Sequence, residues 1–331
     1  MTYSAGGLIQ ATDYNTFAGN TTAGLNRVWS TGSGDAGWGQ TDISTVSTSG
    51  QVTATQWATI VNNLSTSGTQ TGTTLTSRTA PVTGNIIAIL ANVSTDITSV
   101  TTARGNAIAS GTEYGTFTGT TSKTTGTGSG QAAWTITFTH TITFPSANQA
   151  RYFWNAGGIV RLKYGKSSTG QDADADWNQL AGWCGTINLT GRVNGATQGI
   201  AAQAYTGTTR LSGTGGTQTT LATTTGWYDL TGSATTIFQL NDTVSPYSTN
   251  FIRTQATATS STVLTLTTVW SDDGTAVVGA TSNISGGTGV TSPATAIGAA
   301  TAPTTLVTYI PPSSATLSNS WGTPTIAASV A

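Results

Sequence analysis

The feature of this sequence that most restricts the fold is a stretch of alternating side chains at residues 133–144. From position 134 onward every second residue is aromatic, aliphatic or imidazole, threonine fills the positions between, and Pro145 ends the pattern. The members of this set are Trp134, Ile136, Phe138, His140, Ile142 and Phe144. Because successive side chains of a β-strand point to opposite faces of the sheet, the pattern predicts a long strand with one buried face.

Shorter segments with strand-like patterns recur along the chain, separated by turn-forming residues. They cover residues 159–164, 227–230, 236–240, 251–258, 262–270 and 306–310. Threonine makes up roughly a fifth of the chain, and its β-branched side chain suits a half-buried strand better than a helix. Many short strands with turns between them favour a sandwich over a parallel α/β sheet. We therefore predict a mainly β fold with an antiparallel β-sandwich-like C-terminal domain.

Four segments space their apolar side chains as helices do. Thr12 is expected to cap a first helix that runs to about residue 28, and Thr53 opens a capping-box pattern leading into a helix that ends at Gly68. A third helix is expected from residue 85 to about residue 103, although its β-branched residues leave a strand open as an alternative. The fourth, at residues 176–188, is amphipathic and is expected to cover one sheet.

The composition also indicates how the chain is divided. Residues 118–130 are almost entirely Thr, Gly and Ser, which is typical of a linker. We expect a helical or mixed N-terminal segment at residues 1–110 for attachment or oligomerisation, a linker at residues 111–130 and a β-sandwich-like domain at residues 131–331. Ten Trp, nine Tyr and seven Phe argue against disorder of the whole chain, and the β domain is expected to fold by itself.

Charged residues are scarce and balanced. They make up 7% of the chain, with 11 Lys and Arg against 12 Asp and Glu, so neither nucleic acid nor an anionic membrane surface is expected as a partner. The sequence contains no long apolar run, so membrane insertion is not expected, and the N-terminus does not resemble a secretory leader. Cys184 is the only cysteine, so stability must come from packing or subunit association rather than from an intrachain disulfide. We expect a homo-oligomer, with a trimer the favoured arrangement.

Groups suited to catalysis are few. His140 is the only histidine, and its place on the apolar face of a strand indicates a packed core histidine rather than a catalytic base. No serine lies in a Gly-x-Ser-x-Gly elbow, and the supply of carboxylates for glycoside hydrolysis is thin. We therefore predict a protein that is not an enzyme and that has no catalytic, cofactor-binding or metal-binding residues.

The densest acidic cluster consists of Asp172, Asp174 and Asp176. Alternating carboxylates of this kind could ligate Ca²⁺, but the glycine and the distal glutamate of an EF-hand loop are missing. A solvated loop that caps the helix carrying Trp177 is the preferred interpretation, and cation binding stays open. Asp272 and the two residues after it are expected to form a hairpin turn.

The tryptophans admit two interpretations, because an exposed indole can stack on a sugar and a buried one fills a core. Periodic positions place Trp134, Trp154, Trp177 and Trp270 in the core. The pattern leaves the remaining candidates undecided, namely Trp38, Trp227 and Trp321.

One segment resembles a known family. Residues 150–162 read Ala-Arg-Tyr-Phe-Trp-Asn-Ala-Gly-Gly-Ile-Val-Arg-Leu. This resembles the signature Arg-[Tyr/Phe]-Phe-[Phe/Trp]-Asn-[Ala/Ser]-Gly-Gly-x-[Ile/Val]-Arg of tail-fibre and virion structural proteins of tailed bacteriophages, including phages of cyanobacteria. A downstream Asp-x-x-Trp pattern from Asp174 to Trp177, a Gly-Thr-Ile at residues 185–187 and the opening at residues 3–9 are similar to the same group. The resemblance is sharp only over residues 150–190.

The resemblance implies a place in a phage tail for a chain made in the cytoplasm of the bacterial host. We expect a tail-fibre or baseplate-associated structural component, involved in particle assembly or host attachment, with copies of itself and other tail proteins as partners. The alternatives are a carbohydrate-binding adhesin that contacts a host surface glycan, a tailspike depolymerase, and a capsid or neck decoration protein.

The same residues also have a direct physical interpretation. The stretch from Asn155 to Gly158 is typical of a turn, because glycine readily adopts positive φ. The apolar runs at residues 152–154 and 159–162 would then form the two arms of a β-hairpin.

Overall fold

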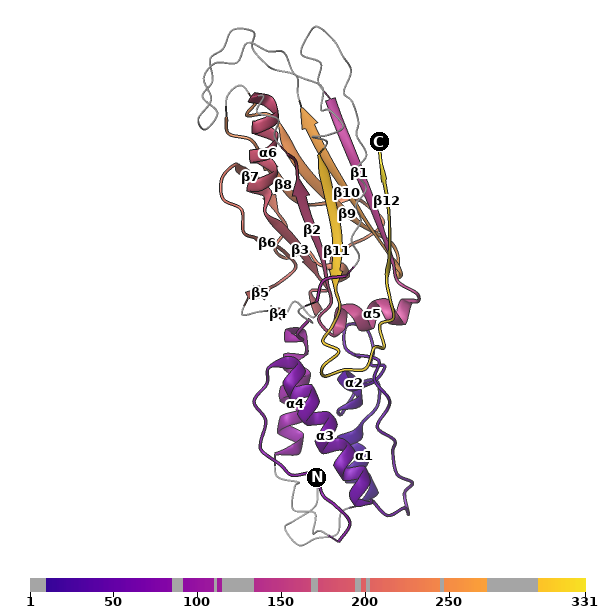
Figure 1. Cartoon of the computed structure of the whole chain (residues 1–331). Coiled ribbons are helices and arrows are strands. Elements are labelled where there is room, and N and C mark those ends of the chain that lie inside the picture. The colour runs from indigo at the N-terminus through magenta and orange to yellow at the C-terminus, as the bar shows by residue number, and fades with distance from the viewer. Residues whose placement is uncertain are drawn as a thin grey trace.

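The computed structural model describes residues 10–84, 92–109, 112–114, 134–167, 172–193, 198–200, 203–244, 247–272 and 303–331. The molecule is elongated, with the N-terminal helices at one end and two β-sheets at the other (Figure 1). The fold is mainly β, as predicted, with helices at the N-terminal end and beside the sheets.

The N-terminal part is built from short helices packed around α3. The elements are α1 (Ala11–Ala18), α2 (Asn26–Trp29), α3 (Ala54–Thr71), α4 (Val93–Ala103) and the 3₁₀ helix η1 (Arg104–Asn106). The predicted capping box opens α3: the backbone N–H of Gln56 donates to Thr53 Oγ1 at 3.3 Å, and the Gln56 amide oxygen accepts from the Thr53 N–H at 2.8 Å. This helix runs three residues beyond the predicted end at Gly68 and stops at Gly72, which has a left-handed φ of 65°.

The first predicted helix, at residues 12–28, was wrong as a single element. α1 ends at Gly19, whose φ is 70°, and the chain turns so tightly that a Cβ there would lie 1.9 Å from the carbonyl oxygen of Ala23. The residue at the N-cap is Gln10, and Thr12 lies inside the first turn. The third predicted helix is confirmed from Val93 onward, while residues 85–91 lie outside the described residues.

The larger sheet is antiparallel, with the strand order β12-β1-β10-β9-β8-β7. Its strands are β1 (Trp134–Thr143), β7 (Thr217–Leu221), β8 (Thr235–Asn241), β9 (Phe251–Ser260), β10 (Val263–Asp272) and β12 (Thr325–Val330). The predicted strand at residues 133–144 is confirmed over Trp134–Thr143, and it pairs with β10 on one side and β12 on the other.

The smaller sheet is also antiparallel and has the order β11-β2-β3-β6. Its strands are β2 (Ile159–Gly165), β3 (Thr186–Thr190), β6 (Thr208–Leu211) and β11 (Thr304–Ile310). A separate hairpin consists of β4 (Gln198–Ile200) and β5 (Gln203–Tyr205).

The two sheets pack face to face. The Tyr164 hydroxyl on β2 lies 2.8 Å from Thr254 Oγ1 on β9, and the Trp270 indole N–H on β10 donates to Thr305 Oγ1 on β11 at 3.1 Å. The helix α6 (Asp172–Cys184) packs Trp177 against Trp270, with ring centroids 5.7 Å apart. These contacts confirm the sandwich-like arrangement and its covering helix.

One predicted strand is a short helix, and one predicted helix ends earlier than expected. The predicted strand at residues 227–230 is the 3₁₀ helix η3 (Trp227–Asp229), in which the Asp229 carboxylate accepts a hydrogen bond from the Gly226 N–H. The helix predicted to reach residue 188 ends at Cys184, because Gly185 turns the chain at a φ of 66° and β3 follows.

One cluster of buried apolar side chains joins the two ends of the molecule. It includes Trp57 of α3, Trp154 near the sheets and Trp270 of β10. The division of the chain at residues 110 and 130 stays a prediction.

Candidate functional site: the joint between helices and sheets

The signature segment forms a helix where a hairpin arm was predicted. After Pro145 ends the first strand, the helix α5 (Ala147–Asn155) begins at Ser146, whose hydroxyl accepts a hydrogen bond from the Gln149 N–H at 3.2 Å. Tyr152, Phe153 and Trp154 therefore lie on a helix, and the hairpin prediction was wrong. This helix lies between the N-terminal helices and the sheets (Figure 1).

The predicted turn exists and connects α5 to β2. Gly157 has a φ of 101°, and a Cβ at this position would lie 2.4 Å from the carbonyl oxygen of Ala107. A Cβ on Gly158 would collide with the Phe153 ring at 2.5 Å. The two glycines let the chain turn while the N-terminal part approaches it closely.

The aromatic side chains of α5 fill the core beside the turn. Phe153 and Trp154 are fully buried, and their ring centroids lie 4.9 Å apart. Trp154 stacks on Trp227 at 5.5 Å, and Phe144 contacts Phe153 at 5.1 Å. Trp154 is therefore a packing residue and not an exposed ligand platform.

Asn155 at the end of α5 connects the sandwich to the N-terminal part. Its amide nitrogen donates to the carbonyl oxygen of Gly37 at 3.0 Å, and its backbone oxygen accepts from the Trp38 indole N–H at 3.1 Å. The Tyr228 hydroxyl donates to its side-chain oxygen. Asn155 and Trp38 are both fully buried, so these bonds are shielded from water.

Arg151 makes a second set of contacts from α5. Its guanidinium donates to the carbonyl oxygens of Gly34 at 3.0 Å and Thr31 at 3.1 Å. The neighbouring Tyr152 ring packs closely on Gly39: a Cβ added to Gly39 would lie 2.3 Å from the ring. The loop at residues 31–39 is thus held against one helix of the sandwich end.

A C-terminal segment, residues 311–324, also contacts the helices before the chain returns to the larger sheet as β12 (Figure 1). The Gln40 amide donates to the carbonyl oxygen of Ser318 at 3.0 Å and accepts from the Ser318 N–H at 2.9 Å. Gln70 of α3 donates to the carbonyl oxygens of Ile108 and Ala156 and accepts a hydrogen bond from Thr316. We use the name joint for the contacts that α5, residues 31–40, Gln70 and residues 311–324 make where the helices meet the sheets.

A row of acidic and amide side chains lies at the opposite end of the larger sheet. Asp242 follows β8, Asn250 precedes β9 and Asp272 is the last residue of β10, all on the face that carries the buried side chains. The Asp242 N–H donates to the Asn250 carbonyl oxygen at 2.9 Å. Asp176 of α6 faces Asp242 and is fully buried. The solvated cap predicted for this aspartate was wrong, and the side chains of Asp172 and Asp174 lie outside the described residues.

The two facing carboxyl groups perturb each other. Burial, and then the neighbouring Asp242, raise the pKa of Asp176 to about 9. Burial also raises the pKa of Asp242, whose Oδ1 accepts the backbone N–H groups of Thr243 and Val244. Two buried carboxyl groups in contact hold a proton between them. Within the described ranges, no three or more His, Cys, Asp or Glu side chains form a group that could hold a metal ion.

His140 lies fully buried on the inward face of β1, as predicted. Burial lowers its pKa to about 4, partly offset by a hydrogen bond with the backbone of Thr305. The imidazole is therefore neutral near pH 7 and packed in the interior.

The tryptophans left undecided by the sequence are all buried. Trp38, Trp227 and Trp321 are at most 7% exposed, and Trp154, Trp177 and Trp270 are at most 2% exposed. The side chain of Trp134 lies outside the described residues. The most exposed aromatic side chain in the described part of the chain is Tyr114, at 49%, and it stacks on Tyr309.

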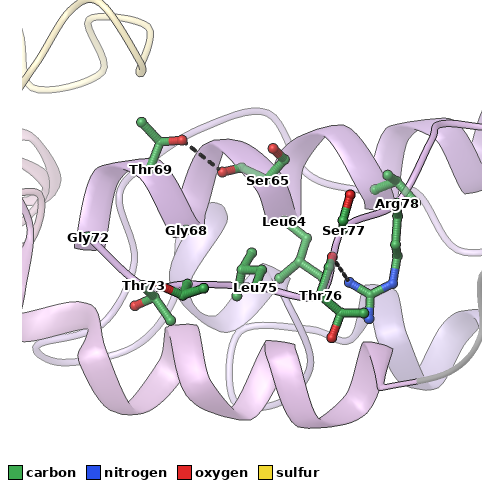
Figure 2. Close-up of a pocket in the computed structure, with 12 residues that line it drawn as sticks. Leu64, Ser65, Gly68, Thr69, Gly72, Thr73, Leu75, Thr76, Ser77 and Arg78 are labelled. Carbon is green, nitrogen blue, oxygen red and sulfur yellow. Dashed lines mark hydrogen bonds between the residues drawn. The ribbon is translucent and has the colours of Figure 1, made fainter.

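A cavity of about 410 Å³ lies along α3, where residues 72–78 run back beside the helix (Figure 2). Ser, Thr and Gly residues make up most of its lining, with Leu64 and Leu75 as apolar members. At one end Arg78 pairs with the buried Asp96 at 2.5 Å and donates to the Thr76 carbonyl oxygen at 3.1 Å. The lining of the cavity contains hydroxyl groups but no histidine or carboxylate that could activate them.

No family model matches the chain, and its comparison with curated proteins and with solved structures finds no match. None of the helices among the described residues is long and apolar enough to cross a membrane.

Proposed function

We propose that the chain is a structural, non-enzymatic component of a tailed-phage virion, a tail fibre or a baseplate-associated protein. The observation that carries the proposal is the role of the signature residues 150–158. Arg151, Asn155 and Gly157 contact the N-terminal part, and Phe153 and Trp154 fill the core beside it. A segment that resembles a virion signature is thus used to join two parts of an elongated molecule.

The chemistry of the described side chains supports a mechanical role. His140 is buried and neutral, and the Asp176–Asp242 pair is buried as well. The charge-poor composition and the threonine-rich strands suit a subunit that packs against other proteins.

The adhesin alternative receives less support. The described tryptophan side chains are buried or partly buried, so sugar stacking would fall to exposed tyrosines such as Tyr228 and Tyr114, and the Tyr114 ring already stacks on Tyr309. The capsid or neck decoration alternative differs from the proposal only in the position of the chain within the particle. Antibody labelling of purified particles separates the two positions.

The proposal is tested on particles purified from cells that make the chain. We expect mass spectrometry to detect the chain in the particle at a fixed stoichiometry, and gold-labelled antibody to mark the tail in electron micrographs. Antibody at the capsid or neck would support the decoration alternative. A chain that is abundant in the lysate and missing from washed particles would refute a virion role.

A further inference from the structure

The outer edge of β12 is unpaired in the described part of the chain. β12 is the last strand in the order of the larger sheet. Thr137 of β1 and Ala331 exchange both backbone hydrogen bonds at 2.9 Å. Because the bonding direction alternates along an antiparallel strand, the N–H and C=O groups of Ile326, Ala328 and Val330 point away from β1.

Backbone hydrogen bonds are made at other edges of the sandwich. The outer edge of β11 is bonded to Tyr114, which exchanges backbone hydrogen bonds of 2.8 and 2.9 Å with Tyr309. On the opposite side, the Thr208 N–H of β6 donates to the carbonyl oxygen of Ala222, directly after β7. β12 has no such cover among the described residues, and it contains no charge, proline or bulge, the features by which natural edge strands avoid pairing.

The apolar face of the sheet is also incomplete at this edge. Phe138, His140 and Ile142 of β1 are fully buried, and their direct partners on β12 are Val330, Ala328 and Ile326. These three partners lie on the same face but are only half-buried, and Ile326 and Val330 pack against the edge of the core. One further strand would complete their burial.

We propose that β12 pairs antiparallel with β12 of a second copy of this chain, about a twofold axis that passes by Ala328. In this register Ala328 lies opposite Ala328 of the other copy, and Ile326 lies opposite Val330. The residues whose N–H and C=O groups point outward are those that meet, so hydrogen bonds form in matched pairs. The two larger sheets become one continuous sheet across the axis.

A second copy fits this edge because the strand is complementary to itself. The apolar residues at 326, 328 and 330 are spaced symmetrically about Ala328, so the inward-facing row continues without a polar interruption. Residues 325–330 carry no charge, so two copies meet without like-charge repulsion. The interface closes on itself as a dimer, in contrast to the trimer suggested by composition. The pairing does not depend on a virion role.

Substitution of Ala328 tests the hydrogen bonds of the edge. Ala328→Pro removes an N–H that faces outward and leaves the bonds to β1 in place, whereas Ala328→Ser keeps the N–H. We expect the wild-type chain and Ala328→Ser to sediment at twice the chain mass of 33.5 kDa, and Ala328→Pro to sediment as a monomer with a similar melting temperature.

A charge exchange tests the register. Ala327 and Ser329 are exposed, and the proposed pairing places each opposite the other across the axis. Ala327→Lys with Ser329→Lys sets like charges opposite each other twice, which we expect to weaken dimerisation by roughly tenfold. Ala327→Lys with Ser329→Glu sets opposite charges there and should restore it.

These measurements distinguish the outcomes even if the proline variant fails to fold. A wild-type chain that is monomeric or trimeric over the whole concentration range would overturn the proposal. So would equal dimerisation of the Lys/Lys and Lys/Glu variants. A dimer in solution without the chain in any particle would leave this interface standing and refute the proposed function alone.

Discussion

Trp154 is the residue whose loss most directly tests the joint. Its indole is fully buried between Phe153 and Trp227, so Trp154→Ala should lower the free energy of unfolding by about 3–5 kcal/mol through the cavity it leaves. Urea unfolding measures this change. Tyr114→Ala is the matched control: its ring is 49% exposed, and we expect a change within about 0.5 kcal/mol. Unchanged stability of Trp154→Ala with lost adsorption to host cells would instead identify a receptor-binding residue.

Asp176 predicts a pH dependence of stability. Its pKa is raised by burial to about 9 in the folded chain, so the folded state holds a proton that the unfolded state releases at much lower pH. The contribution of this group is fully present below about pH 4 and is lost as the pH rises toward 9. Asp176→Asn should remove this slope.

The comparison is made on unfolding free energies of the wild type and Asp176→Asn between pH 5 and pH 9. The difference between the two curves isolates Asp176 from His140, whose lowered pKa acts in the opposite direction at acid pH. A difference that is constant with pH would contradict a shared proton in the Asp176–Asp242 pair.

The sequence could predict which side chains point inward better than what they touch. The two-residue period placed His140 on the buried face of a strand, because direction alternates along a strand whatever its partners are. The contacts of Asn155 with Gly37 and Trp38 join residues more than a hundred positions apart, and no local pattern encodes them. Gln70 was missed for the same reason.

Among the elements, α5 shows how a local signal can be overlooked. Aromatic residues followed by an Asn-Ala-Gly-Gly turn favoured a hairpin, since Tyr, Phe and Trp are common in strands. The preceding Ser146 and Gln149, three residues apart, match a helix-capping pattern, and the structure uses it. The cap at Thr53 was recognised because regular helical spacing followed it.

Ser146 provides a test of that cap. Ser146→Ala removes the acceptor for the Gln149 N–H and should lower stability by about 1 kcal/mol, whereas Ser146→Asp keeps an acceptor at the N-cap. Thermal or urea unfolding of the two variants measures the difference. If both variants unfold like the wild type, the cap does not contribute to the position of α5.

For the whole molecule, the shared core decides whether the sandwich can stand alone. The sequence suggested that residues 131–331 would fold without residues 1–110. Trp57 and Trp154 belong to one buried cluster, and Trp38 donates a hydrogen bond into α5, so the isolated fragment would expose apolar surface and unpaired polar groups at the joint. We expect the fragment to aggregate or to melt well below the full chain in calorimetry. A cooperative melt at the full-chain temperature would show that the joint adds little.

The sequence was sufficient to predict the class of fold. It was not sufficient to predict the order of the strands in the sheets. Alternation located β1, β9 and β10, but it does not state which strands are neighbours. β12 was missed because its neighbour β1 lies far away in the sequence, and its six residues combine weak apolar alternation with small side chains. Pairings of this kind depend on the complete chain rather than on a local window.

The position of β1 in its sheet also fixes an order of events during synthesis. Its two neighbours begin at Val263 and Thr325, so the most regular strand of the molecule leaves the ribosome long before either partner exists. At about 5–20 residues per second, the wait for β10 alone lasts on the order of ten seconds. During that time a strand with one strongly apolar face is open to chance pairing with other nascent chains, so we expect early protection of this strand by chaperones to be a condition for high yield.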